Sequence, residues 1–194
     1  MYLLLVIVGA GLLSPAQSLS CYYCSLGGSS ICMSMTRECP SPRHQCAAVI
    51  KLIDTGSSHI IDLHERTCAL PEQCTEMSIN YGKARKAVNV QCCSTDLCNN
   101  QMAANPSNIS LNGRKCYRCV GQYCDITMDC LGSEDSCFTF TARSGAVTLK
   151  GCASKLACDP VAGSFLLRKH GENDTMECCQ EDFCNSSPAG SSAD

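Results

Sequence analysis

The sequence predicts an all-β, disulfide-rich protein made of two tandem domains, and three observations lead to this fold class. First, 20 of its 194 residues are cysteine, a density typical of small secreted domains held together by disulfides. Second, the stretch CCSTDLCNN at residues 92–100 returns as CCQEDFCNS at residues 178–186. Third, several segments between cysteines alternate apolar and polar residues, as the strands of β-hairpins do. A reducing cytosol would not keep so many cysteines paired, so we expect an extracellular protein.

The N-terminal segment reads as a secretory signal peptide over residues 1–18, or alternatively over residues 1–20. An apolar run from Tyr2 to Leu13 is followed by small and polar residues, and this run is shorter than the roughly 20 residues that a membrane-spanning helix needs. No second apolar stretch follows, and residues 186–194 are small and polar. We therefore expect no membrane span, a disordered tail over 186–194, and a protein secreted freely into the extracellular space.

The cysteines form two sets of ten, each opening with C-x-x-C and closing with CC-x4-CN. The first set is Cys21, Cys24, Cys32, Cys39, Cys46, Cys68, Cys74, Cys92, Cys93 and Cys98, and the second is Cys116, Cys119, Cys124, Cys130, Cys137, Cys152, Cys158, Cys178, Cys179 and Cys184. A repeat of this kind predicts a first domain over residues 19–99 and a second over residues 115–185. The polar residues 100–114, which include a proline and a glycine, have the composition of an exposed linker.

Hairpin patterns lie in the longer intervals between cysteines. In the second domain CFTFTARSGAVTLKGC alternates Phe and Thr before a turn at 143–145. In the first domain CAAVIKLIDTGSSHIIDLHERTC turns near residues 54–56, and its apolar run is denser than one buried face requires. A neighbouring domain could cover the excess, or the excess could be an exposed binding face. The candidate contact residues are Ile50, Leu52, Ile53, Ile60 and Ile61.

Catalysis and metal binding are not expected. The sequence contains neither G-x-S-x-G nor H-E-x-x-H, and its four histidines, at 44, 59, 64 and 170, are scattered. C-x-x-C alone could be a redox motif or half of a zinc site, but here it opens a ten-cysteine set without histidine at ligand spacing. We therefore expect a protein that is not an enzyme and that needs no cofactor.

The net charge of −3 gives no reason to expect a nucleic-acid partner. One basic stretch, YGKARKAVNV at residues 81–90, carries Lys83, Arg85 and Lys86. It is either a solvated strand face or a contact for an acidic partner or a proteoglycan. Glycosylation sequons occur at Asn108 and Asn173, and a formal third one at Asn185 is expected to stay empty.

The ten-cysteine pattern that opens with C-x-x-C and closes with CC-x4-CN resembles the Ly6/uPAR domain, which has the three-finger fold. That resemblance covers both domains and implies five disulfides in each. The implied pairs are Cys21–Cys46, Cys24–Cys32, Cys39–Cys68, Cys74–Cys92 and Cys93–Cys98, then Cys116–Cys137, Cys119–Cys124, Cys130–Cys152, Cys158–Cys178 and Cys179–Cys184. It also implies that Asn99 and Asn185 hydrogen-bond to the backbone near the first strand of their domains.

Three further stretches, ECPSPRHQC (38–46), LNGRKCYRCVGQYC (111–124) and KGCASKLAC (150–158), are similar to gamma-type phospholipase A2 inhibitors and related two-domain uPAR-like proteins. The leading hypothesis from this resemblance is a secreted protein that blocks a secreted phospholipase A2 sterically, and such inhibitors tend to form homo-oligomers. The alternative is a uPAR-like receptor, adhesion protein or protease-binding ligand. A channel modulator is a weaker third hypothesis, since those toxins usually act as single domains.

Overall fold

The computed structural model describes residues 17–24, 35–56, 60–106, 109–141, 147–166 and 175–186. The strands are β1 (Ser20–Tyr23), β2 (Met35–Glu38), β3 (Gln45–Asp54), β4 (Ile60–Ala69), β5 (Glu76–Asn80), β6 (Arg85–Cys93), β7 (Leu111–Val120), β8 (Tyr123–Leu131), β9 (Ser136–Thr141), β10 (Val147–Ala153) and β11 (Thr175–Cys179). Three short 3-10 turns complete the described elements: η1 (Pro71–Gln73), η2 (Lys155–Cys158) and η3 (Ala162–Phe165). The fold is all-β, as the sequence predicts. Within the described part of the chain, no helix is long and apolar enough to cross a membrane.

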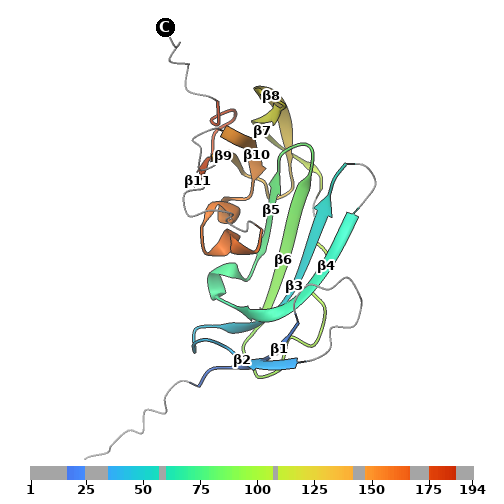
Figure 1. Ribbon diagram of the computed structural model, residues 1–194, viewed down its shortest axis with the longest axis vertical. Helices are drawn as coiled ribbons and strands as arrows, with labels where there is room; N and C mark the ends of the chain where they lie inside the picture. Colours follow the sequence, from blue (N-terminus) through green and yellow to red (C-terminus); the bar gives the residue numbers. More distant parts are fainter. Residues whose placement is uncertain are drawn as a thin grey trace, which may run out of the picture.

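One seven-stranded antiparallel sheet runs through both domains in the order β11-β9-β10-β5-β6-β3-β4. The two domains meet where β10 pairs with β5, with Cys152 opposite Asn80 and Ala153 opposite Ile79 (Figure 1). Two separate hairpins, β1–β2 and β7–β8, form two-stranded sheets. In each domain the first finger is therefore a separate hairpin, and the remaining strands belong to the seven-stranded sheet.

Both expected hairpins are present as β3–β4 and β9–β10. The turn of the first begins at Asp54, whose Oδ1 accepts a hydrogen bond from the Gly56 N–H at 2.8 Å. Gly56 has φ of +70°, a left-handed conformation that suits a residue without Cβ. The expected turn at 143–145 lies outside the described residues.

The first strand of the second domain begins earlier than the sequence suggested. β7 starts at Leu111, inside the segment 100–114 that composition marked as a linker. Its pairing with β8 is irregular between Leu111 and Lys115, and Gly113 there has φ of +90°. A glycine in a bulged strand end looks in sequence like a loop residue.

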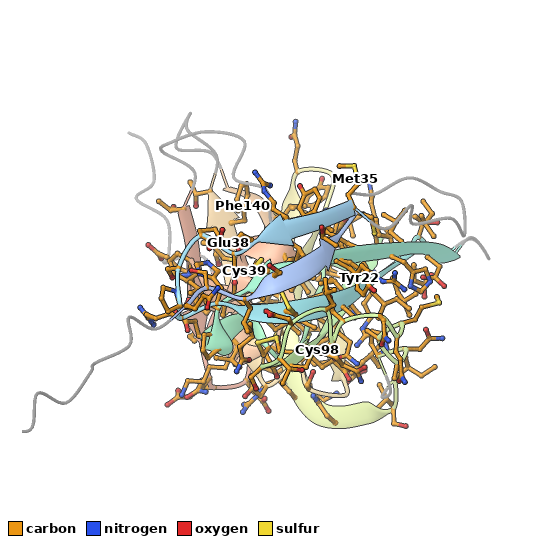
Figure 2. All side chains as sticks on the ribbon, turned by 90° about the horizontal axis from the view of Figure 1, so that it is seen from below. Tyr22, Met35, Glu38, Cys39, Cys98 and Phe140 are labelled. Carbon is orange, nitrogen blue, oxygen red and sulfur yellow. A yellow bond between two sulfur atoms is a disulfide. The ribbon has the colours of Figure 1, made fainter. Side chains whose placement is uncertain are left out.

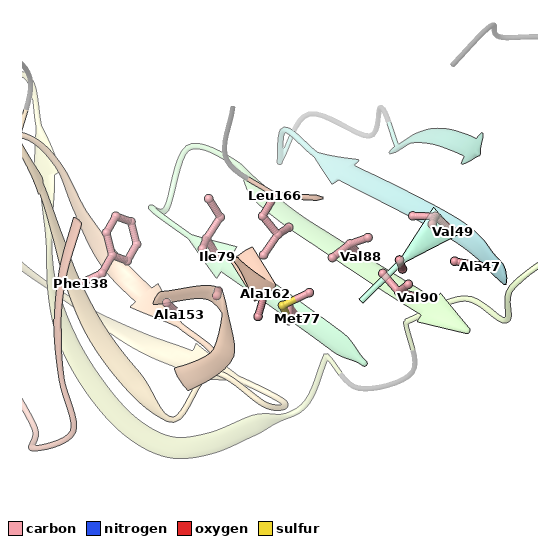
Figure 3. Packing of buried hydrophobic residues seen from close by; sticks show 12 residues of the cluster. Ala47, Val49, Met77, Ile79, Val88, Val90, Phe138, Ala153, Ala162 and Leu166 are labelled. Atoms are coloured by element: carbon pink, nitrogen blue, oxygen red, sulfur yellow. The ribbon is translucent and has the colours of Figure 1, made fainter. Parts of the chain in front are cut away.

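One face of the seven-stranded sheet carries the main apolar core, and we call it the front face. Val49, Met77, Ile79 and Val88 of the first domain form one buried cluster with side chains of the second domain. The second-domain members are Phe138, Ala153, Ala157, Ala162 and Leu166. Figure 3 shows Ala162 and Leu166 lying over the strands that carry Met77, Ile79 and Val88. The segment containing η2 and η3 is thus a lid of the second domain on the first domain's sheet.

The back face is covered by other parts of the chain. Ile50 and Ala48 pack against Ala103, and the Asn89 side-chain amide donates to the Ala104 carbonyl at 2.9 Å. The chain between the domains therefore crosses the back of the first domain on its way to β7 (Figure 1). Under the β7–β8 finger, burial lowers the pKa of the Lys150 ammonium, which Asp125 partly offsets.

Nine disulfides join described cysteines, and they are the same pairs that the family resemblance implied. They are Cys21–Cys46, Cys39–Cys68, Cys74–Cys92, Cys93–Cys98, Cys116–Cys137, Cys119–Cys124, Cys130–Cys152, Cys158–Cys178 and Cys179–Cys184. Cys24 is also disulfide-bonded, but its expected partner Cys32 lies outside the described residues. Figure 2 shows β1 and β2 crossing the first domain, with Cys39 and Cys98 in the base beneath them.

Candidate functional site

Two buried asparagines hold the base of the domains in the same way. The Asn99 side chain accepts from the Tyr22 N–H at 3.0 Å and donates to the carbonyls of Tyr22 and Ala47 at 3.0 and 2.9 Å. The Asn185 side chain repeats this with Tyr117 and with Phe138 O. Each links the first strand of its domain to a strand of the large sheet, which is the structural role that the resemblance implied.

The aspartate and the apolar residue between the last cysteines also have a role, which sequence reasoning missed. Asp96 accepts from the Ser20 N–H at 2.9 Å, and Asp182 accepts from the Lys115 N–H at 3.2 Å. The next residues, Leu97 and Phe183, have φ of 56° and 59°, so the chain turns sharply at matching positions. The repeated D-x-C-N of both copies was the available signal.

The surroundings of Asp182 favour its ionised form. The Lys115 N–H and the Arg114 guanidinium, which lies 2.9 Å away, hold the pKa of the Asp182 carboxyl below its ordinary value. Both copies of the closing motif thus hold the base of their domains through matching hydrogen bonds.

A buried acid fastens the two domains to each other. Glu134 of the second domain has no exposed side-chain surface, and its Oε1 lies 2.7 Å from Nε of Arg85 in the first domain. The same carboxylate accepts from Ser78 Oγ at 3.2 Å, from Asn80 Nδ2 at 3.5 Å and from the Leu131 N–H at 3.0 Å. A carboxylate with this many partners offsets the cost of its burial, which an unpaired one would not.

Backbone contacts tighten this junction. Ser154 N–H donates to the Ser78 carbonyl at 2.9 Å, and Ser78 N–H donates to Ser154 Oγ at 3.1 Å. A Cβ at Gly151 would collide with the Asn80 carbonyl oxygen, so glycine permits the close approach of β10 to β5. The neighbouring Gln73 amide donates to Val161 O and Ser164 Oγ at 3.1 and 2.9 Å.

The basic stretch at residues 81–90 divides into two parts. Arg85 is engaged by Glu134 and is therefore a structural residue of the junction. Lys83 is exposed in the turn between β5 and β6, and Lys86 is half-buried on the front face. Only these two lysines of the stretch are placed to meet an outside partner.

The apolar second finger is partly covered, and its residues separate by face. Val49, at 1% exposure, belongs to the core that the second domain covers. Ile50 is also 1% exposed, with the partly buried Leu52 on the same back-face cluster. Ile50 is therefore not a surface contact, and coverage by neighbouring parts of the chain accounts for this portion of the run.

The outer part of the same finger is open on the front face. Ile53 pairs with Ile61 and with Lys86, and Lys51 pairs with Leu63. We call Lys51, Ile53, Ile61, Leu63 and Lys86 the distal finger surface. Ile61 is 46% exposed and the others are half-buried. The side chain of Ile60, another candidate contact, is outside the described set.

Lys51 marks the border between this surface and the second domain. Its ammonium lies 3.0 Å from Glu65 Oε2 and 5.4 Å from the centre of the Phe165 ring. The contact with Phe165 is a cation–π contact across the two domains. The distal finger surface therefore begins where the lid of the second domain ends.

Each of the two described histidines contacts a side chain close to it in sequence. His44 Nδ1 is 2.9 Å from Ser41 Oγ, and His64 Nε2 is 3.1 Å from Asp62 Oδ1. His59 and His170 lie outside the described residues. The groups of three potential metal ligands found in the described chain are Cys21, Cys39 and Cys68, and Cys116, Cys130 and Cys152. All six sulfurs are consumed by disulfides.

Of the three sequons, those at Asn108 and Asn173 lie outside the described residues and stay predictions. Asn185 is 4% exposed, and its amide nitrogen donates two hydrogen bonds. A glycan on this nitrogen would replace one of its two hydrogens and would therefore break at least one of these bonds.

Comparison with known proteins identifies a domain family in each half. Residues 17–101 match the family model described as u-PAR/Ly-6 domain, and residues 114–185 match the one described as snake toxin and toxin-like protein. A crystal structure of mouse TEX101 is similar to this chain with a TM-score of 0.32 and 15% identity. That similarity covers 84% of this chain and 99% of the TEX101 chain. At such a score it adds nothing to the two domain matches.

Proposed function

The chain belongs to the Ly6/uPAR family and carries two of its three-finger domains in tandem, and from this premise we propose that it inhibits a secreted phospholipase A2. Such domains are typically extracellular and bind proteins, and the families are generally non-enzymatic. The proposed mechanism is steric: the protein covers the mouth of the enzyme's active site or its membrane-docking surface, and no covalent step is needed.

The distal finger surface is the observation that supports this proposal. Its apolar side chains lie on a strand pair whose inner part is fixed by the second domain, so the outer part is presented as a rigid platform. A rigid apolar centre with a lysine at its edge has the composition of a protein-binding surface. Little ordering entropy would be lost when a partner binds to it.

The test is lipid hydrolysis by a panel of secreted phospholipases A2 with rising amounts of the oxidised protein. The proposal predicts inhibition that reaches its endpoint at a stoichiometric ratio. Ile61→Asp should weaken inhibition, because it places a charge on the most exposed apolar side chain of the distal finger surface. Ile109→Asp is the matched control, since Ile109 is 72% exposed and lies between the domains, and it should inhibit like the wild type. A flat response across the panel would sink the proposal.

A second candidate function is that of an extracellular receptor-like or adhesion ligand, and the β7–β8 finger favours it. Tyr123 is 74% exposed and Val120 is 40% exposed, and they pair at the tip of this hairpin. The Cys119–Cys124 disulfide fixes the tip. An exposed aromatic on a rigid loop is a suitable anchor for a protein partner. Pull-down from extracellular fluid with Tyr123→Ser as control tests this function, and equal capture by the two proteins would contradict it.

Self-association stays a prediction. The distal finger surface is also the candidate contact for a homo-oligomer, and light scattering across a concentration series measures it. Ile61→Asp should then lower the oligomer mass, and an unchanged mass would exclude this surface from the contact.

A further inference from the structure

We propose that the junction of the two domains carries a separate binding surface for a sulfated polysaccharide, built from Lys83, Lys86 and Arg118. The proposal does not rest on the proposed inhibition: Lys86 also belongs to the distal finger surface, but Lys83 and Arg118 do not, and Arg118 comes from the second domain. We call these three residues the junction cations.

The β5–β6 turn and the β7 strand hold the junction cations together. Tyr81 N–H donates to the Ala84 carbonyl at 3.1 Å and closes the turn, and Gly82 N–H donates to Asn80 Oδ1 at 3.0 Å. The Arg118 side chain lies across this turn: a Cβ at Gly82 would be 2.5 Å from Arg118 Cδ and 2.9 Å from Nη1. Lys83 follows Gly82 directly, so a cation of each domain lies at this turn.

The charge of these residues is not neutralised within the described part of the chain. Arg85, between the two lysines, has Glu134 as its partner, and Lys51, Arg114 and Lys115 each have a carboxylate. In the described ranges neither a hydrogen bond nor an ion pair engages the side chains of Lys83, Lys86 and Arg118. Like charges held close together repel, and a polyanion bound across them would remove that repulsion.

The arrangement fits a linear polyanion better than a single small anion. Lys83 stands on a turn, Lys86 is on the front face of β6, and Arg118 comes from the neighbouring finger, so the cations are spread along a ridge and do not converge on one pocket. Arginine and lysine so placed can each contact a different sulfate of a repeating chain. Because such contacts release counterions, binding should weaken steeply with added salt.

The experiment measures binding of the full oxidised protein to a heparin-derived oligosaccharide over a series of salt concentrations. The wild type should bind with a log Kd that rises linearly with log salt concentration. Lys83→Glu should weaken binding roughly tenfold and lower the salt slope by about one. Arg37→Glu is the matched control: it changes the charge equally on exposed β2, at the opposite end of the molecule (Figure 1). It should bind within about twofold of the wild type.

Arg118→Gln gives a second variant from the other domain, and it should weaken binding in the same direction as Lys83→Glu. An equal loss in Arg37→Glu would show that net charge alone is sensed and would overturn the proposal. Absence of binding by the wild type at physiological salt would also overturn it. Equal affinity for polyglutamate or for anionic lipid vesicles would assign the surface to an acidic protein or a membrane.

Discussion

The two domains share the same structure at their disulfide-bonded base but differ in the surfaces above it. At the base the copies agree group for group: Asn99 and Asn185 bridge the same strands, and Leu97 and Phe183 share one unusual backbone conformation. Above the base they differ. The first domain presents an aliphatic sheet face, whereas the second domain supplies the segment with η2 and η3 that covers it. The buried cysteine clusters, by contrast, occur in the bases of both domains.

This difference separates what each domain needs for itself from what it needs for its partner. Each domain needs its own disulfide base, because a small domain buries too little apolar surface to be stable without one. The fingers of the two domains can differ in sequence because the segment with η2 and η3 of the second domain completes the core of the first domain. The part of the second finger left uncovered is then the part available to an outside partner.

Removing Glu134, which bonds residues of both domains, should produce the largest effect. Glu134→Ala removes one partner of the buried Glu134–Arg85 pair, a change that costs about 3–5 kcal/mol of unfolding free energy. Denaturant unfolding with the disulfides intact measures it, with the exposed Glu181→Ala as control. A loss no larger than that of the control would mean that the junction does not depend on this carboxylate.

Replacing the base asparagines should give equal effects in the two domains. Asn99→Ala and Asn185→Ala each leave buried backbone groups unpaired, which costs about 1–3 kcal/mol. Secretion yield and melting temperature should both fall. Asn100→Ala, next in the chain and exposed, should change neither. Unchanged yield and melting temperature in Asn99→Ala would contradict the bridging role.

Two glycines with similar φ angles allow the finger tip to be compared with the junction: Gly56 lies in the β3–β4 turn and Gly82 in the β5–β6 turn. Gly56→Ala and Gly82→Ala both place a Cβ at positive φ, which costs roughly 1–2 kcal/mol. Nothing lies within 4 Å of a Cβ at 56, whereas a Cβ at 82 meets Arg118. Gly82→Ala should lower the melting temperature at least as much as Gly56→Ala, with a small extra loss because the flexible end of Arg118 must shift. A smaller loss in Gly82→Ala than in Gly56→Ala would contradict this contact.

The smallest predicted effect is the loss of the stability that ionised Asp182 contributes when the pH is lowered. Since its folded pKa is depressed, its ionised form stabilises the fold at neutral pH. This stability is present above the ordinary aspartate pKa of about 3.9 and is lost as pH falls through the lower folded value. The melting temperature of Asp182→Asn should therefore differ from that of the wild type at neutral pH and converge with it in strong acid. A difference that stays constant across pH would contradict this linkage.

The repeat, the fold class and the hairpins could be predicted because each depends on residues that are close in sequence: C-x-x-C, CC-x4-CN and alternating apolar residues. The burial of Ile50 could not, since it depends on Ala103, a residue of a polar connecting segment far along the chain. Glu134 gave no local signal either, because its partners Arg85 and Ser78 lie in the other domain. The pairing of β10 with β5 could not be predicted either, since it forms only when the two folded domains meet.

The two domains form one continuous sheet, and amide hydrogen exchange of the intact protein tests this directly. The Ser154 N–H donates to Ser78 O, and the Ser78 N–H donates to Ser154 Oγ, across the junction. Both amides should exchange as slowly as the core amide of Val88, and far more slowly than that of Thr36 in the exposed β2. Exchange of Ser78 and Ser154 as fast as Thr36 would show that the domains move independently and would remove the basis for both proposed surfaces.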